Sequence, residues 1–440
     1  MARNLSLSTL RTIRIPRVWL VAGGGWVGRA MQILAQLAAV RIMTDSLGVS
    51  GYGAFAVLVS LNGWLILSDL CIATGLQNFV SQAKAAGSQV NDIVITAAVL
   101  SLAATCASLL LLLLAGPFLS RALLGNFSSL AQNEMLFAFY AVCLCIGASA
   151  LGSIAYRVWF AEHRGYLSNL LPAVATVAGT MLLWLAARQD FAQPLTASVL
   201  AYYLPVAIIP LVALGMRIRD AARRGRFNGA LVGPLLQRGF RFWIFGVLAA
   251  GVLQVDYIVM SQVLEEADIA LYSIVARLFA MVLFMYSALL AALWPLCTEM
   301  ASRRDWDSLI RAMRRYLLLG LAFAVLSGAV LLAINPWIMG LLSPALGIVV
   351  PGGIIVLMTV YVLIRIWTDT FAMVLQSMDD LRVLWIVTPV QSLLSIGLQT
   401  VGAQQFGLVG LICGLIACFV LTTAWALPYR VLHHVRSPLS

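Results

Sequence analysis

Charged side chains are scarce in this chain of 440 residues, because Asp, Glu, Lys and Arg together make up only 10% of it. Soluble globular proteins carry about 25% of these residues, so the composition excludes an ordinary soluble enzyme or binding domain. Hydrophobic residues make up 62% instead, and they recur in runs long enough to cross a bilayer as helices. The composition therefore predicts an all-α polytopic membrane protein.

Histidine and paired cysteine are equally scarce. The three histidines are His163, His433 and His434, and none lies within an apolar run. The seven cysteines lie in or beside apolar runs without a C-x-x-C pair, and buried free cysteine behaves as a small hydrophobe. We therefore expect no metal, no disulfide and no cofactor. The zinc-protease H-E-x-x-H motif, the Walker loop and the G-x-S-x-G nucleophile motif are also absent from the sequence, which argues against bound ATP and against an enzyme. A G-x-G-x-x-G pattern at Gly23, Gly25 and Gly28 lies inside an apolar run and not in a βαβ unit, so we interpret it as close helix packing.

Lysine is almost missing, since Lys84 is the only one among 28 basic residues, and the formal net charge is +11. A strongly basic chain can indicate a nucleic-acid partner. Here the arginines gather in the segments between apolar runs, where basic residues set the topology of a membrane protein. We therefore expect contact with membrane lipids and no nucleic acid.

The apolar runs predict about twelve transmembrane helices. Their approximate bounds are 18–42, 52–73, 93–117, 135–155, 166–187, 195–215, 241–262, 270–296, 316–334, 352–376, 383–402 and 407–428. The longest basic loop, 216–240, follows the sixth of them. It divides the chain into two expected six-helix bundles, residues 1–225 and 226–440, as in many transporters built from repeated halves.

The distribution of basic residues tests this count. If the N-terminus is cytoplasmic, 22 basic residues lie in cytoplasmic segments and only Arg121 and Arg188 lie in outer segments. This asymmetry follows the positive-inside rule. It predicts a multi-pass protein with both termini in the cytoplasm.

The first expected helix carries a polar stripe. Helical spacing places Arg29, Gln32 and Gln36 on one face. A charge near the middle of a membrane costs on the order of 3 kcal/mol, so such a face is expected to meet protein or a water-filled cavity. Arg29 has no acidic residue on its own face, which makes it a candidate ligand for an anionic group.

Other charges lie within or beside the expected spans, namely Arg41, Asp69, Asp256, Arg277, Arg365 and Asp369. Arg365 and Asp369 are four residues apart, a spacing that favours a structural ion pair. Asp256 and Arg277 lie on neighbouring helices, where pairing with each other competes with a functional role. Asp69 lies near the cytoplasmic end of its helix, where solvation or the capping of a loop competes with a functional role.

Two segments resemble the bacterial polysaccharide-transport family of the multidrug/oligosaccharidyl-lipid/polysaccharide exporter superfamily. The first contains Arg41, Leu47-Gly48, Tyr52-Gly53, Trp64 and Ser68-Asp69-Leu70, with Cys71 where the family usually has glycine. The second contains Asp256, Tyr272 and Ala276, with Ala270-Leu271 in place of the usual Val-Gly. The resemblance implies a V-shaped fold, alternating access, and a central cationic cavity lined mainly by the first, second, seventh and eighth helices.

The resemblance also implies a function: a flippase that moves undecaprenyl-pyrophosphate-linked oligosaccharide across the bacterial inner membrane for O-antigen, capsule or exopolysaccharide synthesis. The expected substrate ligands are Arg29, Gln32, Gln36, Arg41 and Arg277, and Asp69, Asp256 and Asp369 are candidates for ion coupling. A polysaccharide polymerase and chain-length proteins are further candidate partners.

Three alternatives stay open at this stage. A cation-coupled multidrug antiporter of the same superfamily would favour acidic residues in the cavity over arginines. A peptidoglycan-precursor flippase would usually have fourteen spans. A membrane glycan polymerase or ligase would be an enzyme with a large charged outer loop, whereas the longest outer loops here, 118–134 and 335–351, hold only Arg121 and Glu134.

Overall fold

The computed structural model describes residues 17–85, 90–127, 129–162, 164–342, 344, 350–378, 380 and 382–436, and this part of the chain is helical, with no β-strand. The helices of the first half are α1 (Arg17–Ser60), α2 (Asn62–Leu65), α3 (Ile72–Ala85), α4 (Val90–Leu124), α5 (Gln132–Ala161), α6 (Gly165–Ala186) and α7 (Pro194–Ala222). The second half contains the short 3₁₀ helix η1 (Gly229–Leu231), α8 (Val232–Leu253), α9 (Val255–Val263), α10 (Glu266–Ser302), α11 (Trp306–Leu342), α12 (Gly352–Ser377), α13 (Arg382–Leu421) and α14 (Thr423–Arg436).

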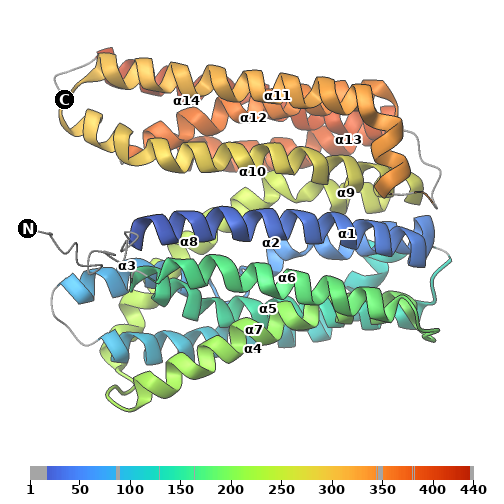
Figure 1. Cartoon of the computed structure of the whole chain (residues 1–440), viewed down its shortest axis with the longest axis horizontal. Coiled ribbons are helices and arrows are strands. Elements are labelled where there is room, and N and C mark those ends of the chain that lie inside the picture. The colour runs from blue at the N-terminus through green and yellow to red at the C-terminus, as the bar shows by residue number, and fades with distance from the viewer. Residues whose placement is uncertain are drawn as a thin grey trace, which may run out of the picture.

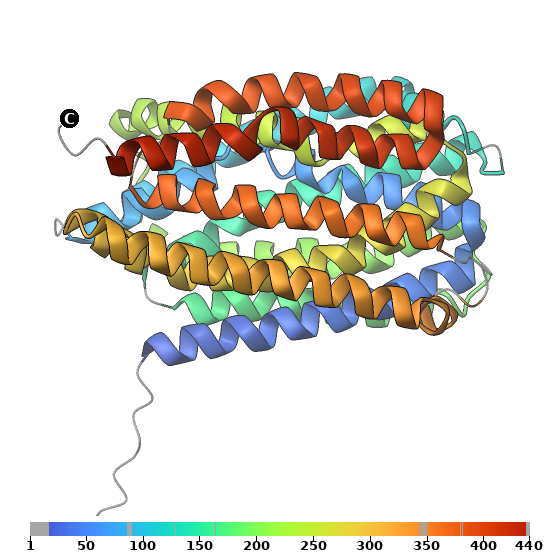
Figure 2. The ribbon, with the colours of Figure 1, turned by 90° about the horizontal axis from the view of Figure 1, so that it is seen from above.

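Ten helical segments in the described part are long and apolar enough to cross a membrane, and two of them are folded double. In α13 the backbone leaves the helical region at Phe406 and Gly407, and a Cβ placed on Gly402 would clash with the carbonyl oxygen of Gly410. Figure 2 shows the two limbs side by side, in orange-red and dark red. This segment therefore crosses twice.

The segment that begins with α1 turns back in the same way, at Gly48, whose φ of 68° is in the left-handed region that glycine tolerates. Gln32 and Ser60 line one cavity, although 28 residues of straight helix would separate them by about 42 Å. Counting both reversals, the ten segments make the twelve passes expected from the sequence.

Two of the passes are broken, which the sequence did not predict. The second pass, expected as a continuous helix over 52–73, is interrupted between α2 and α3, where Leu70 and Cys71 have positive φ values. The seventh, expected over 241–262, is interrupted at Gln254, between α8 and α9. The two broken passes lie side by side, because a Cβ on Gly63 of α2 would meet the side chain of Gln254, and one on Gly239 of α8 would meet the carbonyl of Leu70.

The two halves of the chain lie side by side in Figure 1, with α1 to α7 in one group and α9 to α14 in the other. Helix α1 packs on α6 within its own half and on α10 across the boundary, while α8 contacts both α3 and α13. The described chain begins and ends at the same end of the molecule, here called the terminal end. An even number of passes requires this arrangement.

Hydrogen bonds join the two halves at the opposite end, here called the far end. Arg41 Nη1 donates to the carbonyl of Leu341 at 3.0 Å, and Thr44 Oγ1 donates to that of Leu342 at 3.2 Å. A third hydrogen bond also crosses between the halves, from Asn126 Nδ2 of the first half to the carbonyl of Ser261 in the second, at 2.8 Å. These contacts close the far end.

Exposed apolar side chains cover the outer faces of the helices. Leu111, Leu114 and Leu393 are each at least 67% exposed although leucine is usually buried in soluble proteins. The largest fully buried side chains, such as Tyr52, Phe55 and Tyr286, belong to a core that extends across both halves. This distribution, apolar outside as well as inside, suits a bundle whose solvent is lipid.

Candidate functional site: a cavity between the two halves

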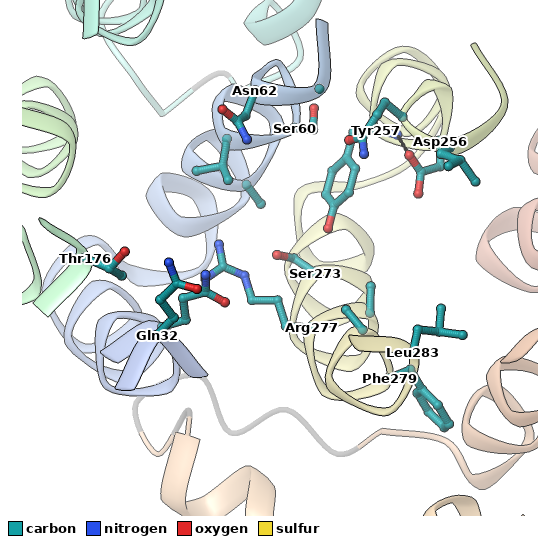
Figure 3. Close-up of a pocket in the computed structure, with 18 of the residues that line it drawn as sticks. Gln32, Ser60, Asn62, Thr176, Asp256, Tyr257, Ser273, Arg277, Phe279 and Leu283 are labelled. Carbon is teal, nitrogen blue, oxygen red and sulfur yellow. Dashed lines mark hydrogen bonds between the residues drawn. The ribbon is translucent and has the colours of Figure 1, made fainter. Parts of the chain in front are cut away.

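A cavity of about 560 Å³ lies between the two halves. Its wall takes Gln32 and Gln36 from α1, Tyr202 from α7, Tyr257 from α9 and Arg277 from α10. Figure 3 shows Gln32 of α1 facing Arg277 of α10, with Tyr257 of α9 beside the same space. Of the residues that the sequence singled out, Gln32, Gln36, Asp256 and Arg277 line this cavity.

Arg277 is the only lysine or arginine among the described residues that line the cavity. Its side chain extends from α10 across the space toward Gln32 on α1 (Figure 3). Within the described part of the chain, Arg277 forms no ion pair, and its neighbours in the wall include the uncharged side chains of Tyr202, Tyr203 and Tyr257. The cavity therefore presents a positive charge that no described carboxylate within salt-bridge distance neutralises.

Asp256 is held by other groups. Its Oδ2 accepts a hydrogen bond from the hydroxyl of Tyr272 at 2.6 Å, and its Oδ1 accepts one from the backbone N–H of Tyr257 at 2.9 Å. It also lies in the first turn of α9, where the helix dipole favours a carboxylate. Pairing of Asp256 with Arg277 was one expectation from the sequence, and it is wrong. The hydroxyl of Tyr272, the backbone N–H of Tyr257 and the dipole of α9 stabilise the carboxylate instead.

The ion pair expected between Arg365 and Asp369 is confirmed. Arg365 Nη2 lies 3.1 Å from Asp369 Oδ2, and Arg365 Nη1 also donates to the hydroxyl of Tyr361 at 3.0 Å. The guanidinium lies over the ring of Phe419 at 5.4 Å. Asp369 is thus engaged with its own helix, and neither member of the pair lines the cavity.

Asp69 and Arg41 also lie outside the cavity wall. Asp69 accepts hydrogen bonds from the backbone N–H groups of Cys71 and Ala73, each at 2.9 Å, so it caps the start of α3. Capping was one of the alternatives for this residue, and the structure confirms it. Arg41 lies at the far end, 3.8 Å from Asp45. Roles for either residue in ion coupling or substrate binding stay predictions.

Arg29 lies beside the cavity rather than in its wall. Its guanidinium is 4.4 Å from the centre of the Phe284 ring on α10. One of its nitrogens, Nη1, is buried without a hydrogen-bond partner among the described residues. The polar face predicted for α1 therefore divides, with Gln32 and Gln36 at the cavity and Arg29 at the contact with the other half. Its role as a substrate ligand stays a prediction.

The sequence analysis missed three of the four tyrosines in the cavity wall, Tyr202, Tyr203 and Tyr257, and named Tyr272 only as part of the family resemblance. Tyr202 and Tyr203 lie with their rings 5.2 Å apart and nearly perpendicular, and Tyr257 and Tyr272 lie 5.5 Å apart. All four line the cavity. For Tyr202, Tyr203 and Tyr257 the only signal in the sequence was their occurrence inside apolar runs, which is also usual for tyrosines that simply fill a core.

Twelve helical passes around a polar cavity between two halves, into which an arginine that forms no ion pair within the described chain extends, are typical of a membrane transporter. No protein-family model matches the chain. It is 34% identical over 420 residues to an O-antigen export protein of Yersinia pseudotuberculosis, covering 95% of this chain and 96% of the relative. It is also 34% identical over 424 residues to an O-antigen transporter of Salmonella typhi, with 95% and 97% covered. The chain belongs to this family of transporters, so it is not an enzyme.

Solved structures support the same fold. An inward-facing multidrug resistance transporter of the MATE family superposes with a TM-score of 0.73 at 13% identity, covering 93% of this chain and 96% of that one. The lipid II flippase MurJ in an inward closed conformation gives a TM-score of 0.71 at 12% identity, with 94% and 87% covered. The fold is therefore the V-shaped exporter fold of their superfamily.

Proposed function

We propose that the protein is a flippase of the bacterial inner membrane. It translocates undecaprenyl-pyrophosphate-linked oligosaccharide units for the synthesis of a surface polysaccharide, which is O-antigen, capsule or exopolysaccharide. The observation that carries the proposal is Arg277, a cavity arginine without an acidic partner among the described residues, in a chain related to O-antigen transporters.

The pyrophosphate suits Arg277. A guanidinium presents several N–H donors in a planar arrangement that matches phosphate oxygens, and such charge-assisted bonds are stronger than neutral ones. Gln32 lies opposite Arg277 in Figure 3 and Gln36 lines the same cavity. Their amides supply further donors, for the same phosphates or for sugar hydroxyls.

The tyrosines and amides suit the sugars. Tyr202, Tyr203 and Tyr257 offer apolar ring faces beside hydroxyl groups, a combination common at sites where a ligand is partly apolar and partly hydrogen-bonding. The polyprenol tail stays in the bilayer, because moving it into water would cost about 0.8 kcal/mol for each CH₂ group. The two halves, residues 1–225 and 226–440, rock about the cavity between them.

The far-end contacts support an access direction. Arg41, Thr44 and Asn126 bond the halves together at that end. With both termini in the cytoplasm, as the basic loops predict, the closed end is the periplasmic one, and the cavity receives its substrate from the cytoplasmic side. A polymerase and chain-length proteins would then take over the flipped units.

A deletion strain tests this function. We expect loss of surface polysaccharide, with lipid-linked repeat units trapped on the inner leaflet, and recovery when the gene is restored. The trapped units separate a flippase from a polymerase, whose loss would leave units on the outer leaflet. Normal polysaccharide together with altered drug sensitivity would contradict the proposal and indicate a multidrug antiporter.

Ion coupling is proposed for Asp256 alone among the three candidate acids, because it lines the cavity. Asp69 caps a helix and Asp369 is paired with Arg365. Transport measured in vesicles with an imposed proton or sodium gradient tests the coupling, with Asp256→Asn as the variant. Equal stimulation of the variant and the parent protein by the gradient would remove Asp256 from this role.

A further inference from the structure

The boundary between α1 and α10 is where the two halves meet along the front of the molecule, as Figure 1 shows. Near the far end of this boundary, Arg41 and Thr44 of α1 are hydrogen-bonded to the end of α11. About 12 residues closer to the terminal end, which is roughly 18 Å along a helix, Arg29 of α1 contacts Phe284 of α10. This contact bridges the two halves.

The contact separates the cavity from the outer surface. On the cavity side, Gln32 of α1 and Leu283 of α10 both line the space. On the outer side, Val27 of α1 is 55% exposed and Met285 of α10 is 43% exposed, as side chains facing lipid are. Arg29 and Phe284 therefore lie between the lipid-facing surface and the cavity.

Arg29 is incompletely satisfied in this position. Its guanidinium rests on the Phe284 ring at 4.4 Å, and Nη1 is buried with no hydrogen-bond partner in the described part of the chain. A cation–π contact stabilises a guanidinium, but it satisfies none of its N–H donors. A phosphate oxygen would satisfy them and is a stronger partner for the charge.

We propose that the Arg29–Phe284 contact is a substrate-displaced latch on a side entrance between α1 and α10. The contact is closed when no substrate is bound. The diphosphate of an incoming isoprenoid lipid takes Arg29 away from Phe284, and the halves part there so that the headgroup enters the cavity while the chain stays in the bilayer. This inference rests on the proposed function, and it adds Phe284 to the residues that govern substrate entry.

Competition between Phe284 and phosphate for Arg29 is the testable consequence. The probe is geranylgeranyl diphosphate, with geranylgeraniol as the uncharged reference, binding to the purified full-length protein in detergent. Phe284→Leu removes the ring but keeps an apolar side chain, so it should bind the diphosphate about two- to fivefold more tightly. Phe284→Trp offers a better cation–π partner and should bind it more weakly. Arg29→Gln should lose at least about tenfold in affinity.

The combined variant gives the sharper result. In the Arg29→Gln background, Phe284→Leu should no longer change the affinity, because no cation is left to compete for. Phe137→Leu, an exposed phenylalanine on α5, is the matched control and should bind as the parent protein does. Unchanged affinity in both Phe284 variants, or an equal Phe284→Leu effect with and without Arg29, would overturn the latch.

Arg277→Gln separates the two proposals. If this cavity variant loses diphosphate affinity while the Arg29 and Phe284 variants do not, the flippase proposal survives and the latch does not. If the parent protein binds the diphosphate no better than the alcohol, both are wrong.

Discussion

The hydroxyl of Tyr272 donates a 2.6 Å hydrogen bond to the carboxylate of Asp256, and both residues are buried at the wall of the central cavity. This bond holds the carboxylate of Asp256 within the wall. The carboxylate of Asp256 accepts hydrogen bonds from Tyr272 and from a backbone N–H, and it forms no ion pair with Arg277. The cavity wall thus carries a carboxylate and a guanidinium that form no ion pair with each other.

Removing that hydroxyl should destabilise the protein. In Tyr272→Phe the buried carboxylate keeps only its backbone donor, and we expect a loss of about 1–3 kcal/mol in the free energy of unfolding. Thermal unfolding in detergent measures the loss. Tyr429→Phe, at a side chain that is 68% exposed, is the control. Equal unfolding temperatures for Tyr272→Phe and the parent protein would contradict this role of the bond.

Arg277 should be required for transport and not for folding. Arg277→Gln removes the only arginine in the described cavity wall, so polysaccharide export should fall at least about tenfold at equal expression. Arg277→Lys keeps the charge without the planar group of donors and should retain part of the activity. Arg314→Gln, at an exposed position on α11, should export normally. Full export by Arg277→Gln would remove this residue from the site.

Arg365 and Asp369 should behave as a structural pair. Asp369→Ala leaves Arg365 uncompensated with a side chain that is only 16% exposed. Asp369 is 38% exposed, so the loss should be below the roughly 3–5 kcal/mol typical of a fully buried pair. The double variant Arg365→Met with Asp369→Leu should be more stable than Asp369→Ala. A double variant that unfolds at a lower temperature than the single one would contradict this.

The hairpin within α13 should depend on a close approach of two glycines. In Gly402→Ala the new methyl group would clash with the carbonyl of Gly410, and we expect overpacking to cost about 1–3 kcal/mol. Gly397 lies on the same limb, and a methyl group added there would have open space around it. Gly397→Ala should therefore leave the unfolding temperature unchanged or raise it. Similar effects of the two substitutions would show that the approach is not tight.

Asp380, at the terminal end, should make stability depend on pH. Burial raises its pKa, but the hydrogen bond and charge of Arg430 and the charge of His434 outweigh burial, so the pKa lies below its usual range. A carboxyl with a lowered pKa stabilises the fold above about pH 3.9, and this stabilisation is lost as the pH falls through the lowered value.

Asp380→Asn should therefore unfold at a lower temperature than the parent protein at pH 7, and the difference should shrink as the pH is lowered below about 4. Thermal unfolding across this range measures it. Asp220→Asn, at an exposed carboxylate, should show a much smaller difference at pH 7. A difference for Asp380→Asn that grows on acidification would mean that the sign is wrong.

Much of the fold could be predicted from the sequence, because the requirement to span a bilayer is local. Apolar runs of about 20 residues must be helical to satisfy their backbone, which placed the passes near their observed positions. The interruptions at Leu70 and Gln254 were not predicted, since each stands within a run whose overall hydrophobicity is that of a continuous spanning helix. At the first interruption, the side chain of Asp69 accepts hydrogen bonds from the freed N–H groups of Cys71 and Ala73.

The site was predictable to a smaller extent. Helical periodicity brought Gln32 and Gln36 to one face, and both line the cavity. The partner of a buried charge depends on contacts between helices distant in sequence, which no local pattern contains. The spacing of Arg365 and Asp369 on one helix was sufficient to predict their ion pair, whereas Asp256 and Arg277 stand on different helices and do not pair.

By itself, the sequence determined that the chain is a multi-pass helical membrane protein, how many times it crosses, and which residues carry charge into the bilayer, since these depend on hydrophobicity and helical geometry. Only the tertiary structure decided which of those charged groups have a hydrogen-bonding or ion-pair partner. Asp69 bonds to backbone N–H groups, Asp256 bonds to Tyr272, and Asp369 pairs with Arg365. Arg29 contacts the ring of Phe284. Arg277 has no carboxylate partner among the described residues of the cavity. A charged group is paired only if its partner lies within a few ångströms, and the packing of the helices sets that distance.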